Sequence, residues 1–268
     1  MKNQFGFIGC GNMGGALAQA LSKSVKGEQI ALCDAFLQKA EDLAKKCQAS
    51  VMTATEIAAE CDYIFLGVKP QMFEEMLSQI RPTLQARKKK AVLISMAAGI
   101  GVSTVERLAG CDAGVIRIMP NTPVSVGKGM ILYCSNDFVT KEEVDIFCEA
   151  MKLAGKLDPI SEHLIDAASA LSGCGPAFVY LFAEALADGA VECGLPRDKA
   201  LLYAAQTLSG AAELLLQTQK HPGELKDAVC SPGGTTIAGV HALENGGFRA
   251  AAMNAVTSAY EKTLSLKK

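Results

Sequence analysis

Closely spaced cysteines are missing from this sequence, although it holds ten cysteines in 268 residues. Even the nearest of them, such as Cys33 and Cys47, are too far apart for a C-x-x-C motif or a cluster of zinc ligands. Several lie within apolar runs, as free buried thiols do: Cys10, Cys33, Cys61, Cys134 and Cys148. We therefore expect no metal site, no disulfide framework and a reducing, cytoplasmic compartment.

A large excess of either charge is also missing, since the formal net charge is −2. The one basic run, at 87–90, is expected to be a solvated loop before a strand, which argues against a nucleic-acid partner. The N-terminus shows no signal-peptide pattern, and we expect no apolar run long enough to span a bilayer. We expect neither nucleic acid nor a membrane as a partner.

A glycine-rich loop follows the first apolar run of the chain. Phe5 to Ile8 reads as a strand, and a helical Ala/Leu pattern begins at Ala16. Between them stands G-x-G-x-x-G, whose context matches the dinucleotide fingerprint. The expected coenzyme ligands here are Ile8, Gly9, Cys10, Gly11, Asn12, Met13 and Gly14. The alternative is a plain strand–turn–helix with small residues for packing.

Strand and helix patterns alternate over the first part of the chain. Expected strands are 4–8, 29–33, 49–52, 62–67, 91–95 and 114–118, with further extended segments at 130–134 and 156–159. Expected helices are 14–24, 37–47, 55–60, 72–81, 103–109 and 141–153. Such alternation predicts an α/β fold, a doubly wound Rossmann domain over 1–160.

The remainder, 161–268, reads as an all-α domain. Ala and Leu recur at helical spacing over 164–171, 178–191, 198–216 and 250–264, with Gly and Pro at the breaks. These helices are apolar on more than one side, so we expect them to bury a face against another subunit. The alternative is a tight Ala-rich bundle.

Three other segments fall where a Rossmann sheet binds its coenzyme, at the carboxyl ends of strands. They contain Val68, Lys69 and Pro70, then Ala97, Ala98 and Gly99, and finally Asn121. The loop that carries Asn121 could equally be a turn between layers. Asp34 ends the second strand, where an acid binds ribose hydroxyls, which favours NADH over NADPH; its alternative role is a helix N-cap.

A second glycine-rich helix start lies near the C-terminus. The segment 225–244 contains Ser-Pro-Gly-Gly-Thr-Thr at 231–236, which opens a helix. Free N–H groups and the helix dipole make such a start an anion site, suited to a carboxylate, unless it is an ordinary cap. The expected substrate-binding residues are Val229, Ser231, Gly233, Gly234, Thr235 and Thr236.

Histidine is scarce, with His163, His221 and His241 as its three positions. His221 precedes Pro222 and is expected to cap a helix. Oxidising an alcohol needs a base, and none is evident. Reducing an imine is less demanding, because a protonated iminium is already the electrophile. The sequence therefore favours an enzyme that mainly positions its substrate and anchors a carboxylate.

Short segments along the whole chain, taken in their order, resemble those of the pyrroline-5-carboxylate reductase family. The resemblance lies in 7–13, 68–70, 97–99, 119–123, 171–177, 187–189, 221–223 and above all 225–244. It implies reduction of 1-pyrroline-5-carboxylate to L-proline by NADPH or NADH. It also implies a Rossmann domain followed by a dimerisation domain, in a homodimer or larger homo-oligomer whose active site two subunits complete.

The resemblance further implies roles for individual residues. Gly233 to Thr236 would hold the carboxylate, Thr236 would also approach the ring nitrogen, and Glu162 would lie near the substrate, so Thr236 and Glu162 are the candidate catalytic residues. Two positions depart from many relatives: Gln219 stands where some have Glu, and Asp34 where many have a small polar residue and use NADPH.

Two other functions are compatible with parts of the pattern. A β-hydroxyacid dehydrogenase would need a catalytic Lys after the Ser-Gly stretch, and 172–179 has neither Lys nor His. A non-enzymatic NAD(P)-sensing protein would not need the anion site at 231–236.

Overall fold

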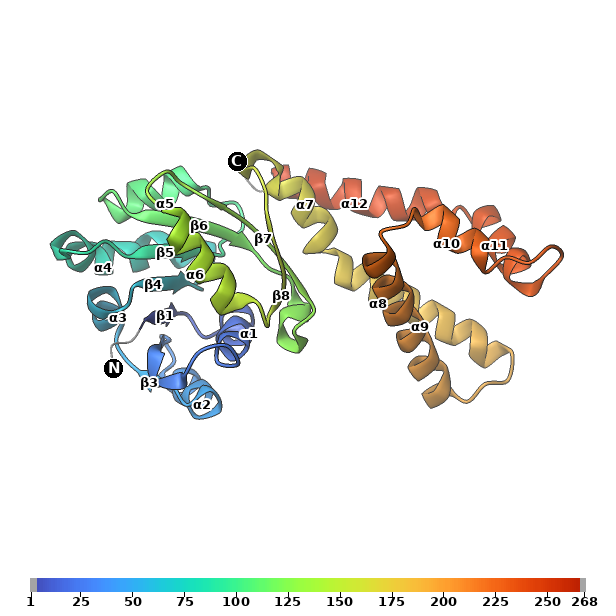
Figure 1. The fold of residues 1–268 in the computed structure, drawn as a ribbon, viewed down its shortest axis with the longest axis horizontal. Coiled ribbons are helices and arrows are strands. Elements are labelled where there is room, and N and C mark those ends of the chain that lie inside the picture. Colours follow the sequence, from blue (N-terminus) through green and yellow to red (C-terminus); the bar gives the residue numbers. More distant parts are fainter. Residues whose placement is uncertain (1–3, 266–268) are drawn as a thin grey trace. The chain divides into compact units, whose positions relative to one another are not determined.

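The computed structural model describes residues 4–265, which form two compact units (Figure 1). The first runs to Gly173 and includes the end of the last helix from Lys262, and the second is Cys174–Glu261. The expected domain boundary at 160/161 falls earlier than this division. The reason is that helix α7 (Ile165–Ser172) packs against strand β7 and so belongs to the first unit.

The first unit is built on a single eight-stranded sheet with the order β3-β2-β1-β4-β5-β6-β7-β8. Its strands are β1 (Phe5–Ile8), β2 (Ile30–Cys33), β3 (Ser50–Val51), β4 (Tyr63–Leu66), β5 (Val92–Ser95), β6 (Gly114–Met119), β7 (Gly129–Ser135) and β8 (Gly155–Pro159). All pairings are parallel except that of β6 with β7. The Rossmann prediction is confirmed.

Helices cover both faces of this sheet. They are α1 (Asn12–Leu21), α2 (Leu37–Cys47), α3 (Ala54–Glu60), α4 (Phe73–Ala86), α5 (Val102–Ala109) and α6 (Lys141–Met151). Thr53 and Glu56 form a capping box at the start of α3, and Thr140 and Glu143 form another at α6. These reciprocal hydrogen bonds fix where two of the helices begin.

Two apolar layers hold the helices to the sheet. Phe5 and Phe7 point to one face with α1, α2 and α6, and the Phe7 ring stacks on Phe65 at 4.2 Å. Ile8 and Ile64 point to the other face with α3, α4 and α5. The central strands β1, β4 and β5 are thus buried on both sides, as the strands of parallel sheets are.

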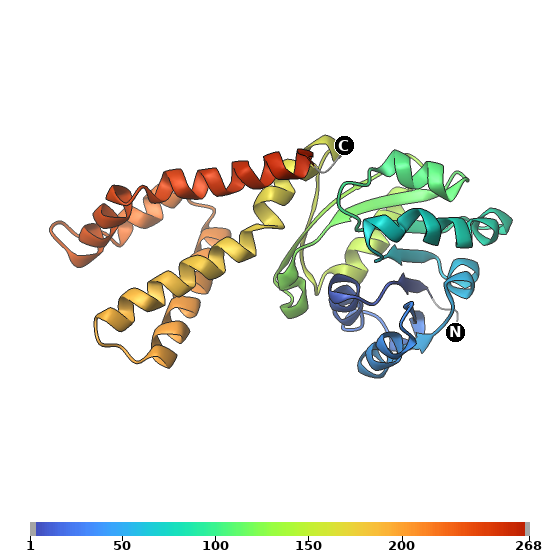
Figure 2. The same ribbon diagram turned by 180° about the vertical axis from the view of Figure 1, so that it is seen from behind.

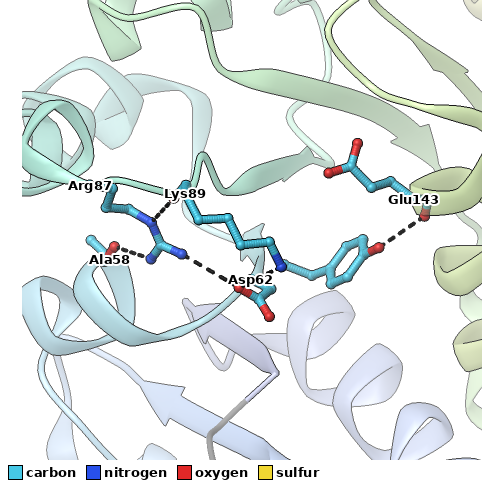
Figure 3. Close-up of polar contacts among 6 residues, drawn as sticks. Ala58, Asp62, Arg87, Lys89 and Glu143 are labelled. Atoms are coloured by element: carbon cyan, nitrogen blue, oxygen red, sulfur yellow. Dashed lines mark hydrogen bonds and ion pairs between the residues drawn. The ribbon is translucent and has the colours of Figure 1, made fainter.

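Arg87, the first residue of the basic run at 87–90, is held inside the first unit by polar contacts (Figure 3). The Arg87 guanidinium donates to the Ala58 carbonyl at 2.6 Å and pairs with Asp62, which Lys89 also approaches. Lys90 lies over the Phe138 ring. The expectation of a merely solvated loop is therefore wrong for Arg87, whose side chain is 7% exposed.

The helices of the second unit can be followed in Figure 2, and they share little core. They are α8 (Gly175–Glu192), α9 (Arg197–Thr218), α10 (Pro222–Ala228), α11 (Thr235–Asn245) and α12 (Phe248–Ser265), whose last residues belong to the first unit. The buried cluster is three alanines, Ala187, Ala200 and Ala204. Large apolar side chains such as Tyr180 and Leu202 are more than half exposed.

One stretch, Glu162–Glu192, is long and apolar enough to cross a membrane, with mean hydropathy 1.4 and 11% of its window buried. This corrects the expectation that no run is long enough. A helix covered by a second copy of the chain has the same length and composition, so the stretch by itself decides little.

Candidate functional site

Each glycine of the first loop has its own geometry. Gly9 has a φ of +107°, and a Cβ there would lie 2.6 Å from the Gly67 carbonyl. A Cβ on Gly14 would lie 2.2 Å from the Gly9 oxygen, whereas one on Gly11 would meet nothing within 4 Å. Gly9 thus makes the turn, Gly14 lets α1 approach the strand, and Gly11 leaves open space over the loop.

Asp34 ties the glycine loop to the end of β2. Its Oδ2 accepts the backbone N–H of Cys10 at 2.7 Å, and its Oδ1 accepts that of Phe36 at 2.9 Å. Phe36, not Asp34, is the N-cap residue of α2, and no side chain caps that helix. The N-cap alternative for Asp34 is therefore not realised, and its negative charge stays beside the loop.

The Cys10 thiol is a packing group. Its Sγ donates to the Cys33 carbonyl at 3.4 Å, and burial, then the nearby Asp34 charge, raises the pKa of this thiol to about 12. A thiol that stays protonated is a poor nucleophile, so Cys10 contributes its backbone rather than its sulfur to the loop.

A cavity of about 460 Å³ opens beside the glycine loop. It is lined by Gly11 and Asn12, by Lys39 and Lys46 of α2, and by Ser125 among others. The Lys39 ammonium lies 5.0 Å from the centre of the exposed Phe36 ring. The cavity thus has two lysines and one acid, Asp42, in its lining, and the lysines are suitable partners for phosphate groups.

The other expected coenzyme loops share this edge of the sheet, because β1, β4, β5 and β6 run parallel. Val68, Lys69 and Pro70 follow β4, with Lys69 exposed before a 3₁₀ turn. After β5, Ala97 is buried, whereas Ala98 and Gly99 are exposed and Gly99 has a φ of +77°. The structure therefore brings these segments to the same edge as the glycine loop.

Asn121 follows β6 and is already engaged at both ends of its amide. Its Nδ2 donates to the Ser172 carbonyl at 2.9 Å, and its Oδ1 accepts the N–H of Met130 at 2.9 Å. The side chain thus braces α7 and β7. Its role as a coenzyme ligand stays a prediction.

Glu162 begins a 3₁₀ turn, Glu162–Leu164, that precedes α7. One carboxylate oxygen, Oε1, accepts the N–H of Val102 at 2.7 Å and the Nη1 group of Arg117 at 3.0 Å. The side chain is 40% exposed and borders a cavity of about 840 Å³ next to the end of β7. Oε1 therefore fixes the start of α5, and any contact with substrate stays a prediction.

The expected anion site at 231–236 lies in the second unit. Gly233 has a φ of +68°, and a Cβ on Gly234 would lie 2.3 Å from Ser231 Oγ. Gly234 caps α11 with no side-chain hydrogen bond, and Thr235 and Thr236 are exposed. Within residues 4–265 neither threonine hydroxyl has a partner. The helix start is thus free to take a carboxylate, with Val229 exposed nearby in sequence.

Two polar residues that sequence reasoning missed complete the surroundings of Glu162. Arg117 interrupts the apolar strand β6 and is 3% exposed, and Asp166 of α7 is 5% exposed. Their charges lie 3.5 Å apart. An arginine inside an otherwise apolar strand was the signal, because a buried cation requires a partner.

His221 caps α10, as its position before Pro222 predicts, since its Nδ1 accepts the N–H of Gly223 at 3.1 Å. In the described part of the chain, no group of three or more His, Cys, Asp or Glu could hold a metal ion.

Two family models match separate parts of the chain. The one described as "Pyrroline-5-carboxylate reductase dimerisation" matches residues 162–266. The one described as "NADP oxidoreductase coenzyme F420-dependent" matches residues 4–99, which contain the glycine loop.

Several relatives match the chain over its full length. The chain is 42% identical to a pyrroline-5-carboxylate reductase of Methanosarcina acetivorans and 40% identical to that of Escherichia coli, with both chains covered completely in each case. A crystal structure of Plasmodium falciparum pyrroline carboxylate reductase with NADP bound is 34% identical, again over both whole chains, with a TM-score of 0.87. On its sequence, its sheet and its helical second half, the chain belongs to the pyrroline-5-carboxylate reductase family.

Proposed function

We propose that this protein reduces 1-pyrroline-5-carboxylate to L-proline with hydride from a nicotinamide coenzyme, the last step of proline biosynthesis. The observation that carries the proposal is the open start of α11, in a family member whose other unit holds a dinucleotide loop. The ten cysteines form no disulfide bond in the described residues, which supports a cytoplasmic location.

The chain's residues need to do little beyond holding the two reactants. When bound, the coenzyme supplies the hydride, which adds to the carbon of the protonated imine, and the nitrogen becomes the secondary amine of proline. The N–H groups at 233–236 would hold the substrate carboxylate, and Ser231 and Val229 would border it. Thr236 Oγ would then approach the ring nitrogen, where a hydroxyl can accept a hydrogen bond from N–H. This leaves electrostatic positioning as the main contribution of the site.

The residues that would hold the coenzyme are those gathered at the carboxyl edge of the sheet. The open space above Gly11 admits a pyrophosphate close to the free N–H groups at the start of α1, where the helix dipole favours negative charge. Val68 to Pro70 and Ala97 to Gly99 would reach the nicotinamide half. Glu162 would act on the substrate through its second oxygen, Oε2, because Oε1 is engaged.

We propose that NADH competes with NADPH as the coenzyme. The Asp34 carboxylate would repel a 2′-phosphate and accept hydrogen bonds from a free 2′-hydroxyl. Each of its oxygens accepts only one backbone N–H, so lone pairs remain for the ribose. Lys39 acts in the opposite sense, since a cation lining the neighbouring cavity would attract a 2′-phosphate.

The exposed apolar helices of the second unit support a homo-oligomer. We propose that this oligomer is built from dimers, in which two subunits share each active site. Three alanines form the second unit's only buried cluster among residues 4–265, while large side chains remain on the surface. A second copy of the chain would cover them.

An assay of NADH and NADPH consumption with 1-pyrroline-5-carboxylate tests the proposed function. We expect turnover that depends on the imine and yields proline. Coenzyme binding without turnover would favour an NAD(P)-sensing protein, and turnover only with a hydroxy acid would favour a β-hydroxyacid dehydrogenase.

A further inference from the structure

A buried charge cluster joins strand β6 to the segment that leads out of the first unit. Arg117 Nη1 donates to Glu162 Oε1 at 3.0 Å, and its Nη2 lies 3.5 Å from Asp166 Oδ1. Arg117 and Asp166 are almost completely buried. One guanidinium therefore faces two carboxylates, one on the turn before α7 and one in its first turn.

The same strand also holds the other end of α7. Asn121, just beyond β6, donates from Nδ2 to the carbonyl of Ser172, the last residue of α7. The second unit begins two residues later, at Cys174. Arg117 of β6 thus contacts the first turn of α7, and Asn121, just after β6, contacts its last residue.

The cluster also reaches the coenzyme side of the unit. The oxygen of Glu162 that accepts from Arg117 also accepts the N–H of Val102, at the start of α5. This helix follows the loop 96–101, which contains the expected nicotinamide contacts Ala97 to Gly99. Gly101 permits the approach, because a Cβ there would lie 3.1 Å from Glu162 Oε1.

The guanidinium is not fully satisfied by these partners. Its Nε and Nη2 groups are buried without a hydrogen bond, so the contact with Asp166 is an ion pair only. Leaving such donors unpaired inside a protein is unfavourable. Replacing a buried ion pair by apolar side chains of similar size often leaves protein stability unchanged or raises it, so stability alone does not account for an arginine here. What the guanidinium does at this position is to hold Glu162 by a hydrogen bond and Asp166 by an ion pair.

We propose that Arg117 is a positioning residue: it fixes α7 on the first unit and, through Glu162, the start of α5. This inference rests on the proposed function, in which hydride transfer needs the coenzyme, bound by the first unit, and the substrate carboxylate, bound at 231–236 of the second unit. The chain passes from one to the other through α7. Arg117 would thus set how often the reacting atoms are correctly placed, while each ligand keeps its own contacts.

Arg117→Lys and Asp166→Asn in the full-length oligomer test this role. Lys keeps the charge but lacks the planar fork that faces two carboxylates. We expect kcat to fall on the order of tenfold to hundredfold, as misplacement of reacting groups does, while the KM for coenzyme stays within about twofold. Hydrogen exchange should accelerate in α7 and remain unchanged in α2. Asp166→Glu, which restores the carboxylate, should recover most of kcat.

The matched control is Ile80→Val, which removes one methylene from the buried α4 far from α7 in sequence. It should lower the melting temperature and leave kcat unchanged. Wild-type-like kcat in both test variants would overturn the proposal, as would a raised KM for coenzyme with intact kcat. If Arg117→Lys fails to fold, Asp166→Asn decides, since it leaves the Arg117–Glu162 pair in place.

The two proposals can fail separately. Absence of imine reduction by the wild-type protein contradicts the proposed function alone, and hydrogen exchange in α7 then still reports whether Arg117 holds this helix. Unchanged exchange in α7 contradicts the positioning role whatever the substrate.

Discussion

Thr236 carries a free, exposed hydroxyl in the first turn of α11. A hydrogen bond to a charged group contributes about 1.5–3 kcal/mol, which corresponds to roughly tenfold to hundredfold. We therefore expect Thr236→Ala to raise the KM for 1-pyrroline-5-carboxylate and to lower kcat/KM by that factor. Steady-state kinetics measure it.

Thr257→Ala is the control for this substitution, because the Thr257 hydroxyl bonds within α12 to Met253 and Asn254. It should leave the kinetics unchanged. Wild-type kinetics in Thr236→Ala would remove this residue from the site.

Asp34 places a negative charge where the coenzymes differ. Asp34→Ser removes the repulsion of a 2′-phosphate, so the ratio of kcat/KM for NADPH to that for NADH should rise. Lys39→Ala should move the same ratio the other way, since it removes a cation lining the neighbouring cavity. The ratio is measured for both variants with saturating imine.

Opposite shifts in these two variants are the expected pattern. A ratio that changes in neither would mean that the 2′ position of the ribose lies away from both side chains. Because Asp34 also holds the Cys10 N–H, binding of both coenzymes should weaken somewhat in Asp34→Ser.

At the scale of elements, helix α1 offers two neighbouring glycines in different surroundings. A Cβ at Gly14 would lie 2.2 Å from the Gly9 oxygen, whereas one at Gly15 would have its nearest neighbour at 3.5 Å. Gly14→Ala must push the helix away from the loop, so we expect weaker coenzyme binding and a loss of about 1–3 kcal/mol in unfolding free energy.

Gly15→Ala is the matched control in the same helix. It fits without a clash, and Ala is a better helix former than Gly by up to about 1 kcal/mol. Denaturant unfolding and coenzyme titration of both variants check the prediction. Equal losses in the two would mean that the glycines serve helix flexibility rather than close packing.

Most elements of the fold could be predicted from the sequence, because their patterns are local. Apolar runs bounded by Gly, Asp or Pro gave the strands of the sheet, and the strand–glycine–helix order gave the dinucleotide loop. The boundaries were less accurate. Helix α1 begins at Asn12, before the Ala/Leu pattern, and α4 continues through Pro82 to Ala86. Tertiary packing decides such ends, and local propensity does not reveal it.

The polar braces could not be predicted because they join residues far apart in the chain. Asn121 and Glu162 were recognised as candidate site residues, but not as partners of Ser172 and Arg117. Likewise, the motif identified the glycines but not the hydrogen bond from Cys10 to Asp34. A single sequence contains no signal for which side chains meet across a sheet.

The whole molecule leaves much apolar surface on its second unit. We expect a homo-oligomer by size-exclusion chromatography with light scattering, and activity that disappears when dilution produces monomers. Leu202→Asp, at a side chain that is 62% exposed in α9, should favour the monomer and abolish turnover while coenzyme still binds.

Leu153→Asp provides the comparison, since this leucine is exposed on the first unit, outside the helical domain. It should leave the oligomer intact. A fully active monomer, from either variant or from dilution, would contradict the shared active site.

The arrangement of the chain has a consequence for its synthesis. All eight strands lie before Gly173, so the ribosome releases a nearly complete sheet while α8 to α12 are still to come. The helices that emerge last carry leucines and tyrosines that stay exposed within their unit, such as Leu202 and Tyr180. Newly synthesised chains should therefore pair soon after release or be held by chaperones. The yield of folded protein should rise with the local concentration of newly synthesised chains.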